Sequence, residues 1–130
     1  MDNYKKESVM KKVLMMAMGL CFILSASPAL AGAPEGEALF KGAAKCKNCH
    51  NTTDKKKVGP GLSKVLDRAG AEWVKSFLAD PQAVWTADEG YTKTLKESVN
   101  SVGKPKPKHK THKLTDEEIE NLLDFLRTLT

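Results

Sequence analysis

Two cysteines and a histidine stand close together at Cys46, Cys49 and His50, in the sequence Cys-Lys-Asn-Cys-His. Thiols three residues apart lie on one side of a helical turn, and the imidazole that follows points to the same side. This C-x-x-C-H spacing is the attachment motif of c-type haem. Both thiols form thioether bonds with the haem vinyl groups, and the histidine binds the iron. The motif therefore predicts one covalent haem c on Cys46 and Cys49, with His50 as an iron ligand.

Three other uses of the two cysteines remain open on the motif alone. A redox-active dithiol expects a βαβ context, and the sequence contains no alternating strand pattern. A structural zinc site would need His109 and His112, but H-x-x-H is tighter than the usual H-x₃₋₅-H spacing. The third alternative is a plain disulfide. Haem c is favoured because an export leader, the adjacent histidine and a short helix-rich chain all agree with it.

The first 31 residues have the pattern of a secretory signal peptide. Four lysines precede an apolar run of 12 residues, Val13 to Leu24. That run is shorter than the ~20 residues that span a membrane, and an Ala-x-Ala cleavage site ends at Ala31. We therefore predict a cleaved leader over 1–31 and one monohaem domain over 32–130. The mature protein is expected in the periplasm, or outside the cell, with no stable membrane span.

Cleavage changes the composition in ways that affect iron chemistry. The chain has a net charge of +5, and loss of four lysines and two acids with the leader leaves +3. All five methionines and Cys21 are lost as well, whereas all three histidines remain. A domain of about 100 residues buries only ~60–70% of the surface that its unfolded chain exposes. A large apolar cofactor would therefore help this domain to fold.

Hydrophobic spacing predicts an all-α domain with a loop-rich middle. Thr115 and Glu118 form a capping-box pattern ahead of the clearest apolar stripe, which predicts the last helix. Pro105 and Pro107 exclude a regular helix over 103–113. Other helices are expected at about 34–44, at 71–79, from Pro81 through Trp85 and, more weakly, at 92–102, with one helical turn at 62–66.

With these motifs the sequence resembles the class I cytochrome c family over nearly all of residues 32–130. The features that match are C-x-x-C-H near the mature N-terminus, the Gly59-Pro60 turn after it, and Leu-Thr-Asp-Glu-Glu-Ile followed by Leu-Leu-x-Phe-Leu at the end. The resemblance implies a cytochrome c-like fold, in which the N- and C-terminal helices cross and loops wrap around one haem. It also implies that the Pro60 carbonyl accepts a hydrogen bond from His50 Nδ1–H, which fixes the tautomer of that ligand.

The resemblance implies roles for further side chains. In this family a tryptophan often donates its indole N–H to a haem propionate, so Trp73 and Trp85 are both candidates. A tryptophan on a helix face is more often a core residue. The small and aromatic contact positions of the crossing helices are matched by Gly36, Phe40, Leu122 and Phe125.

The second iron ligand departs from the family pattern. The usual ligand is a methionine before the last helix, but residues 32–130 contain no methionine. His109 lies six residues before Thr115, a spacing that suits the methionine of short bacterial members. His112 lies only three residues before Thr115, and the chain between the two residues spans at most ~10 Å. We predict His109 as the distal ligand, with His112 as the alternative and ligation by neither as the third outcome.

The predicted function is one-electron transfer between redox partners, without enzymatic activity. No Ser/His/Asp set, phosphate-binding glycine loop or carboxylate pair accompanies the haem motif. The alternatives are a haem protein that binds gases or other ligands, and the cytochrome subunit of a larger oxidoreductase. We expect a monomer that meets protein partners transiently and does not bind nucleic acid. A positive patch that would steer it to acidic partners is offered by Lys104, Lys106, Lys108, Lys110 and Lys113.

Overall fold

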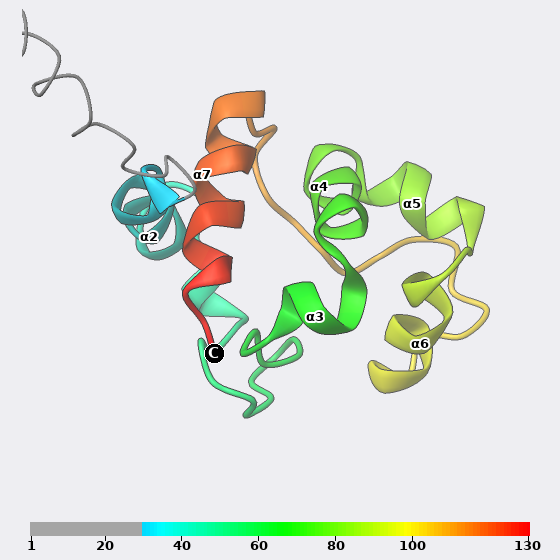
Figure 1. The fold of residues 1–130 in the computed structure, drawn as a ribbon. Helices are drawn as coiled ribbons and strands as arrows, with labels where there is room; N and C mark the ends of the chain where they lie inside the picture. Colours follow the sequence, from blue (N-terminus) through cyan, green and yellow to red (C-terminus); the bar gives the residue numbers. More distant parts are fainter. Residues whose placement is uncertain (1–29) are drawn as a thin grey trace, which may run out of the picture.

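The computed structural model describes residues 30–130, and the predicted leader lies almost entirely outside this range. The described residues form a helical domain without strands, so the all-α prediction is confirmed (Figure 1). None of its helices is long and apolar enough to cross a membrane. In chain order the elements are α2 (Ala33–Lys41), the 3₁₀ turn η2 (Cys46–Asn48), α3 (Val65–Ala69), α4 (Ala71–Ala79), α5 (Pro81–Ala87), α6 (Tyr91–Ser98) and α7 (Asp116–Arg127).

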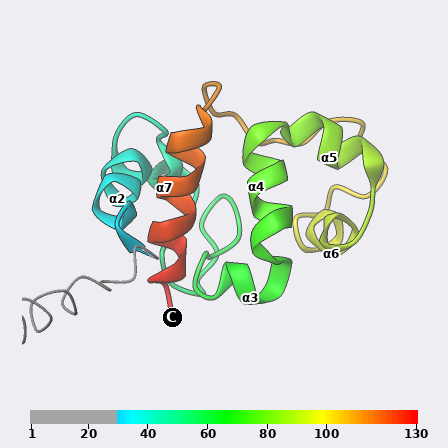
Figure 2. The same ribbon diagram turned by 45° about the horizontal axis from the view of Figure 1, so that its top comes forward.

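Helices α2 and α7 cross in close contact, and both ribbon views place them side by side (Figures 1 and 2). Gly36 allows this approach, because a Cβ at that position would lie 1.9 Å from the Asn121 carbonyl oxygen and 2.8 Å from Phe125 Cβ. One turn further on, the rings of Phe40 and Phe125 pack with their centroids 5.3 Å apart. The predicted crossing of the terminal helices is confirmed, with Gly36, Phe40 and Phe125 at the contact. Leu122 is buried in the core.

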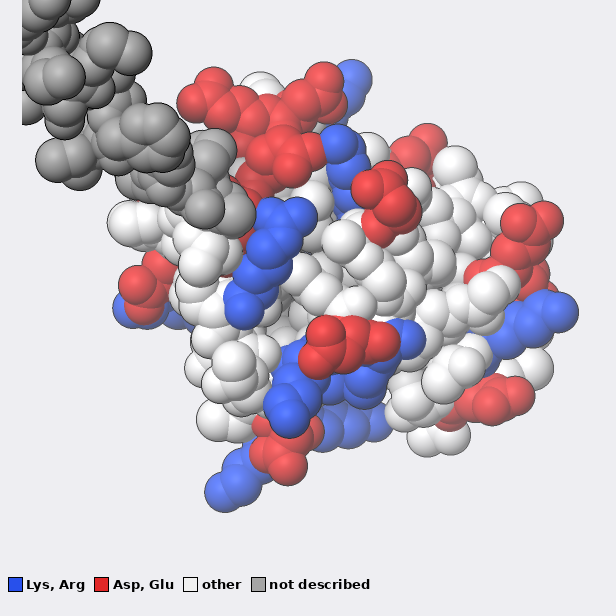
Figure 3. Space-filling view, in the orientation of Figure 1, with Lys and Arg blue, Asp and Glu red and all other residues white. Residues whose placement is uncertain are grey.

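Helix α7 supplies much of the core. Its start is the predicted capping box: Glu118 N–H donates to Thr115 Oγ1 at 3.2 Å, and Thr115 N–H donates to Glu118 Oε2 at 2.8 Å. Acidic side chains gather over this end (Figure 3), where they interact favourably with the helix dipole. One face of α7 is fully buried and carries Ile119, Leu122, Leu123, Phe125 and Leu126. Burying each such side chain contributes about 1.5–3 kcal/mol, so this face anchors the domain.

Two predicted helix boundaries on either side of the cysteine motif were wrong. The helical turn expected at 62–66 begins only at Val65, because Lys64 adopts a left-handed conformation that a helix cannot contain. The first helix ends at Lys41 rather than at 44, since Gly42 leaves the helical conformation.

The middle of the chain otherwise follows the predicted order. Helix α4 has the predicted bounds, and α5 begins at Pro81, where the Asp80 side chain accepts a hydrogen bond from Ala83 N–H at 2.9 Å. Helix α6 is shorter than predicted and ends at Ser98, because Asn100 adopts a left-handed conformation. The segment 103–113 has no regular secondary structure, as its prolines predicted. We call this segment the strap.

Candidate metal centre

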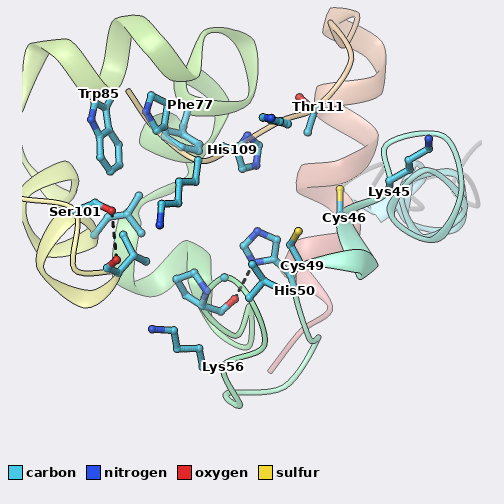
Figure 4. A pocket seen from close by; sticks show the side chains of 18 of the residues that line it. Lys45, Cys46, Cys49, His50, Lys56, Phe77, Trp85, Ser101, His109 and Thr111 are labelled. Carbon is cyan, nitrogen blue, oxygen red and sulfur yellow. Dashed lines mark hydrogen bonds between the residues drawn. The ribbon is translucent and has the colours of Figure 1, made fainter. Parts of the chain in front are cut away.

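The cysteine motif forms a single turn that faces a cavity. In η2 the N–H groups of Cys49 and His50 both donate to the Cys46 carbonyl, at 3.1 and 2.9 Å. Lys45, in a left-handed conformation, introduces this turn after α2. The two cysteines do not form a disulfide with each other. Together with His50 they line a cavity of about 250 Å³, as Figure 4 shows.

His50 is held by the Gly59-Pro60 turn. Its Nδ1 lies 2.8 Å from the Pro60 carbonyl oxygen, which is the contact that the resemblance implied. Gly59 packs against the ring, and a Cβ there would lie 2.5 Å from His50 Cε1. The turn itself is tied to the motif, since Gly59 N–H donates to the Cys49 carbonyl at 2.8 Å. The Pro60 carbonyl oxygen can only accept a hydrogen bond, so Nδ1 carries the hydrogen and donates it, and Nε2 is left free to bind a metal.

His109 faces His50 across the cavity (Figure 4). The two ring centroids are 6.3 Å apart, and Phe77 of α4 packs edge-on against the His109 ring at 5.0 Å. The Nδ1 of His109 is buried without a hydrogen-bond partner among the described residues. Burial, with the nearby His50 as a second cause, lowers the pKa of His109 to about 4. The imidazole is therefore neutral near pH 7, which is the form that binds metals.

His112 lies elsewhere. Its side chain is 44% exposed, and its Nε2 is 3.9 Å from Glu118 Oε1 at the start of α7. It lines neither of the cavities that His50 and His109 share. The structure thus separates two histidines that the sequence places only three residues apart.

A second cavity of about 110 Å³ adjoins the first and shares Cys46, His50, Pro60 and His109 with it. Its wall is apolar and is drawn from α2, α3, α4, α6 and α7, so nearly every helix contributes to one buried site. A buried apolar wall around two imidazoles and two thiols suits a large flat cofactor better than a hydrated ion.

The two candidate tryptophans each have a hydrogen-bond partner within the protein. Trp73 Nε1–H donates to Thr92 Oγ1 at 3.0 Å, and Trp85 Nε1–H donates to the Lys104 carbonyl at 2.8 Å. Both indole donors thus have protein partners in this structure. Sequence reasoning missed Thr92, which is fully buried. A threonine 19 residues from its tryptophan leaves no local pattern that would have revealed the pair.

Comparison with known proteins identifies the family. The Cytochrome c family model matches residues 33–130, so the chain belongs to the cytochrome c family. No curated protein matches. Among solved structures, cytochrome c from Rhodothermus marinus is similar with a TM-score of 0.61 and 24% identity, covering 76% of this chain and 77% of that one. An engineered form of that cytochrome gives a TM-score of 0.62, also at 24% identity, and covers 82% and 84% of the two chains.

A further solved structure, the engineered Rhodothermus marinus cytochrome bound to a carbene intermediate, gives a TM-score of 0.60. At 24% identity these structures establish the fold. Family membership and the C-x-x-C-H motif together establish the class: this chain is a monohaem c-type cytochrome whose haem is covalently attached through Cys46 and Cys49. The site fits that cofactor, because both thiols, two facing imidazoles and a buried unpartnered nitrogen line the same cavity.

Proposed function

We propose that this protein is an exported one-electron carrier whose haem iron is bound by His50 and His109. The haem supplies a single Fe(III)/Fe(II) couple. The residues of this chain hold the two ligands, exclude water from them and present charge to a redox partner.

The observation that carries this proposal is the spacing of the two imidazoles. An imidazole nitrogen binds a first-row metal ion at about 2 Å, and its ring centre lies about 1 Å further out. Two such rings on opposite sides of one ion therefore have their centroids about 6 Å apart. The separation of 6.3 Å between the ring centroids of His50 and His109 is close to this value.

Two histidine ligands favour electron transfer over ligand binding. Pro60 fixes the orientation of His50, and the edge of Phe77 packs against His109, so both rings are held. A site closed on both sides has no open position for a gas or a substrate. Methionine ligation raises the reduction potential, so a His/His site lies below a His/Met relative in potential.

Charge at the cavity supports a transient and acidic partner. The cavity is lined by four lysines, and the strap carries five exposed lysines, of which two line the cavity as well. Positive charge around a binding face raises the rate of encounter with a negatively charged partner. The lysines at the cavity are Lys45, Lys56, Lys108 and Lys110.

Optical and EPR spectra of the purified oxidised protein test the ligand assignment. We expect a low-spin spectrum without the far-red methionine–iron band. His109→Ala should convert it to high spin and open the reduced protein to rapid CO binding, whereas the control His112→Ala should leave both unchanged. If His109→Ala keeps the low-spin spectrum, His109 is not the ligand, and rapid CO binding by the wild type would favour the ligand-binding alternative.

The partner proposal is tested with charged redox reagents. Reduced protein should be oxidised by anionic ferricyanide at a rate that falls as ionic strength rises, and by a cationic cobalt(III) complex at a rate that rises. Lys110→Gln should slow the reaction with ferricyanide. The matched control is Lys75→Gln, since Lys75 pairs with Glu120 and does not line the cavity. Equal rates for the two variants, or a flat response to salt, would contradict the proposal.

A further inference from the structure

The strap that carries His109 is attached at its beginning to α5. Trp85 Nε1–H donates to the Lys104 carbonyl at 2.8 Å, and Gln82 Nε2–H donates to the Pro105 carbonyl at 3.0 Å. Figure 2 shows the strap, drawn in orange, passing along α5 on its way to α7. The strap has almost no backbone hydrogen bonds of its own, since Lys104 N–H to Ser101 is the only one that a strap residue makes with another described backbone group. These two side chains are therefore its principal polar attachment.

Trp85 is itself held rigidly. Its side chain is only 3% exposed. The Lys96 ammonium lies 5.0 Å from the centre of its ring and donates both to the Trp85 carbonyl at 2.9 Å and to Asp88 Oδ1 at 2.8 Å. The Lys96 side chain is 12% exposed, so this cation is partly shielded from water. A donor fixed in this way determines where the Lys104 carbonyl lies.

The position of Lys104 is transmitted to His109 through a short and stiff segment. Five residues of extended chain reach at most ~18 Å. Pro105 and Pro107 fix φ at two of these positions and reduce the number of conformations that the segment can adopt. When its start is released, the strap gains conformational freedom, and His109 spends more time away from His50.

We propose that Trp85 and Gln82 are positioning residues that hold His109 opposite His50 by anchoring the strap to α5. This inference rests on the proposed function, in which His109 binds the iron. Neither side chain is itself an iron ligand. Their role is to keep rare the state in which His109 has left the iron, which we call the ligand-off state. Loss of either side chain should therefore change both ligand binding at the iron and the flexibility of the strap.

The test uses the haem-loaded protein with conservative variants. Trp85→Phe keeps an aromatic ring and removes only the indole donor, and Gln82→Met keeps the length of the side chain and removes the amide. The control is Thr86→Val, because Thr86 is the other partner of Gln82 at 2.9 Å and is exposed on the same helix. It leaves both bonds to the strap intact. Guanidinium unfolding of each variant reports global stability separately.

The first readout is the rate of CO binding to the reduced protein, which is limited by the population of the ligand-off state. Loss of one neutral hydrogen bond changes such a population about fivefold. We expect Trp85→Phe to bind CO about fivefold faster than the wild type, the double variant with Gln82→Met at least tenfold faster, and Thr86→Val within twofold. The second readout is the rate of tryptic cleavage within the strap, which should rise when the strap is released because a protease needs a flexible backbone. The Lys-Pro bonds at 104–105 and 106–107 resist trypsin, so cleavage within the strap is confined to the bonds after Lys108, Lys110 and Lys113.

The outcomes separate this inference from the proposed function. If His109→Ala binds CO rapidly while Trp85→Phe and the double variant bind it at the wild-type rate, His109 is the ligand but α5 does not position it. If His109→Ala leaves CO binding unchanged, the ligand assignment fails, and the positioning role fails with it. Faster CO binding that appears equally in Thr86→Val, or that follows global stability alone, would also overturn the inference. Faster CO binding and faster cleavage confined to the two strap-anchor variants would support it.

Discussion

Replacing Gly36 by valine should disrupt the crossing of α2 and α7. A Cβ at Gly36 would lie 1.9 Å from the Asn121 carbonyl oxygen and 2.6 Å from the carbonyl carbon. Both are backbone atoms of α7, so no side-chain rotation relieves the contact, and the helices must separate by more than about 1 Å to reach van der Waals distance. Phe40 and Phe125 then lose their packing as well. Overpacking costs about 1–3 kcal/mol, and a collision with backbone belongs at the upper end of that range.

The expected loss for Gly36→Val is therefore about 3 kcal/mol. At about 4–8 °C per kcal/mol for a domain of this size, Tm should fall by about 12–24 °C, and the yield of haem-loaded protein should fall with it. The measurement is thermal unfolding of the holoprotein. The matched control is Ala38→Val, which places the same side chain on the exposed face of α2 and should cost roughly 0.5 kcal/mol in helix propensity. A Gly36→Val protein that melts within about 3 °C of this control would refute the reasoning.

Three further predictions concern the ends of the domain and the haem linkage. Thr115→Ala removes the α7 cap and should cost about 1 kcal/mol in guanidinium unfolding; an unchanged midpoint would contradict it. Asp124→Asn weakens the acceptor of the Gly32 N–H group, 3.1 Å away, and should lower the free energy of unfolding by about 1 kcal/mol. The loss of stability should be larger in a protein that begins at Gly32, where that nitrogen is a charged N-terminus, than in one that begins at Ala31. Haem should stay with the polypeptide through acid–acetone extraction, in Cys49→Ala as well, because one thioether remains; release of free haem from the wild type would exclude covalent attachment.

Features that depend on neighbouring residues were predictable from the sequence. The C-x-x-C-H turn and the capping box at Thr115 each lie within four or five residues, so residue type and spacing determine them. The apolar stripe of α7 and the bounds of α4 were predicted for the same reason, since helical periodicity is a local signal. The contact between His50 and Pro60 spans ten residues and was reached only through the family resemblance.

The sequence alone determined the class of cofactor, because the residues that attach haem lie in one short motif. It also limited the candidates for the second iron ligand, because the region after the leader has no methionine. It favoured His109 over His112 only by the spacing to Thr115 that short members of the family show, since both histidines stand in the same lysine-rich segment. Tertiary structure placed His109 opposite His50 and left His112 beside Glu118. It also gave both tryptophans protein partners 19 residues away. Such contacts depend on how α4, α5 and α6 pack, and packing between distant segments leaves no local pattern in the sequence.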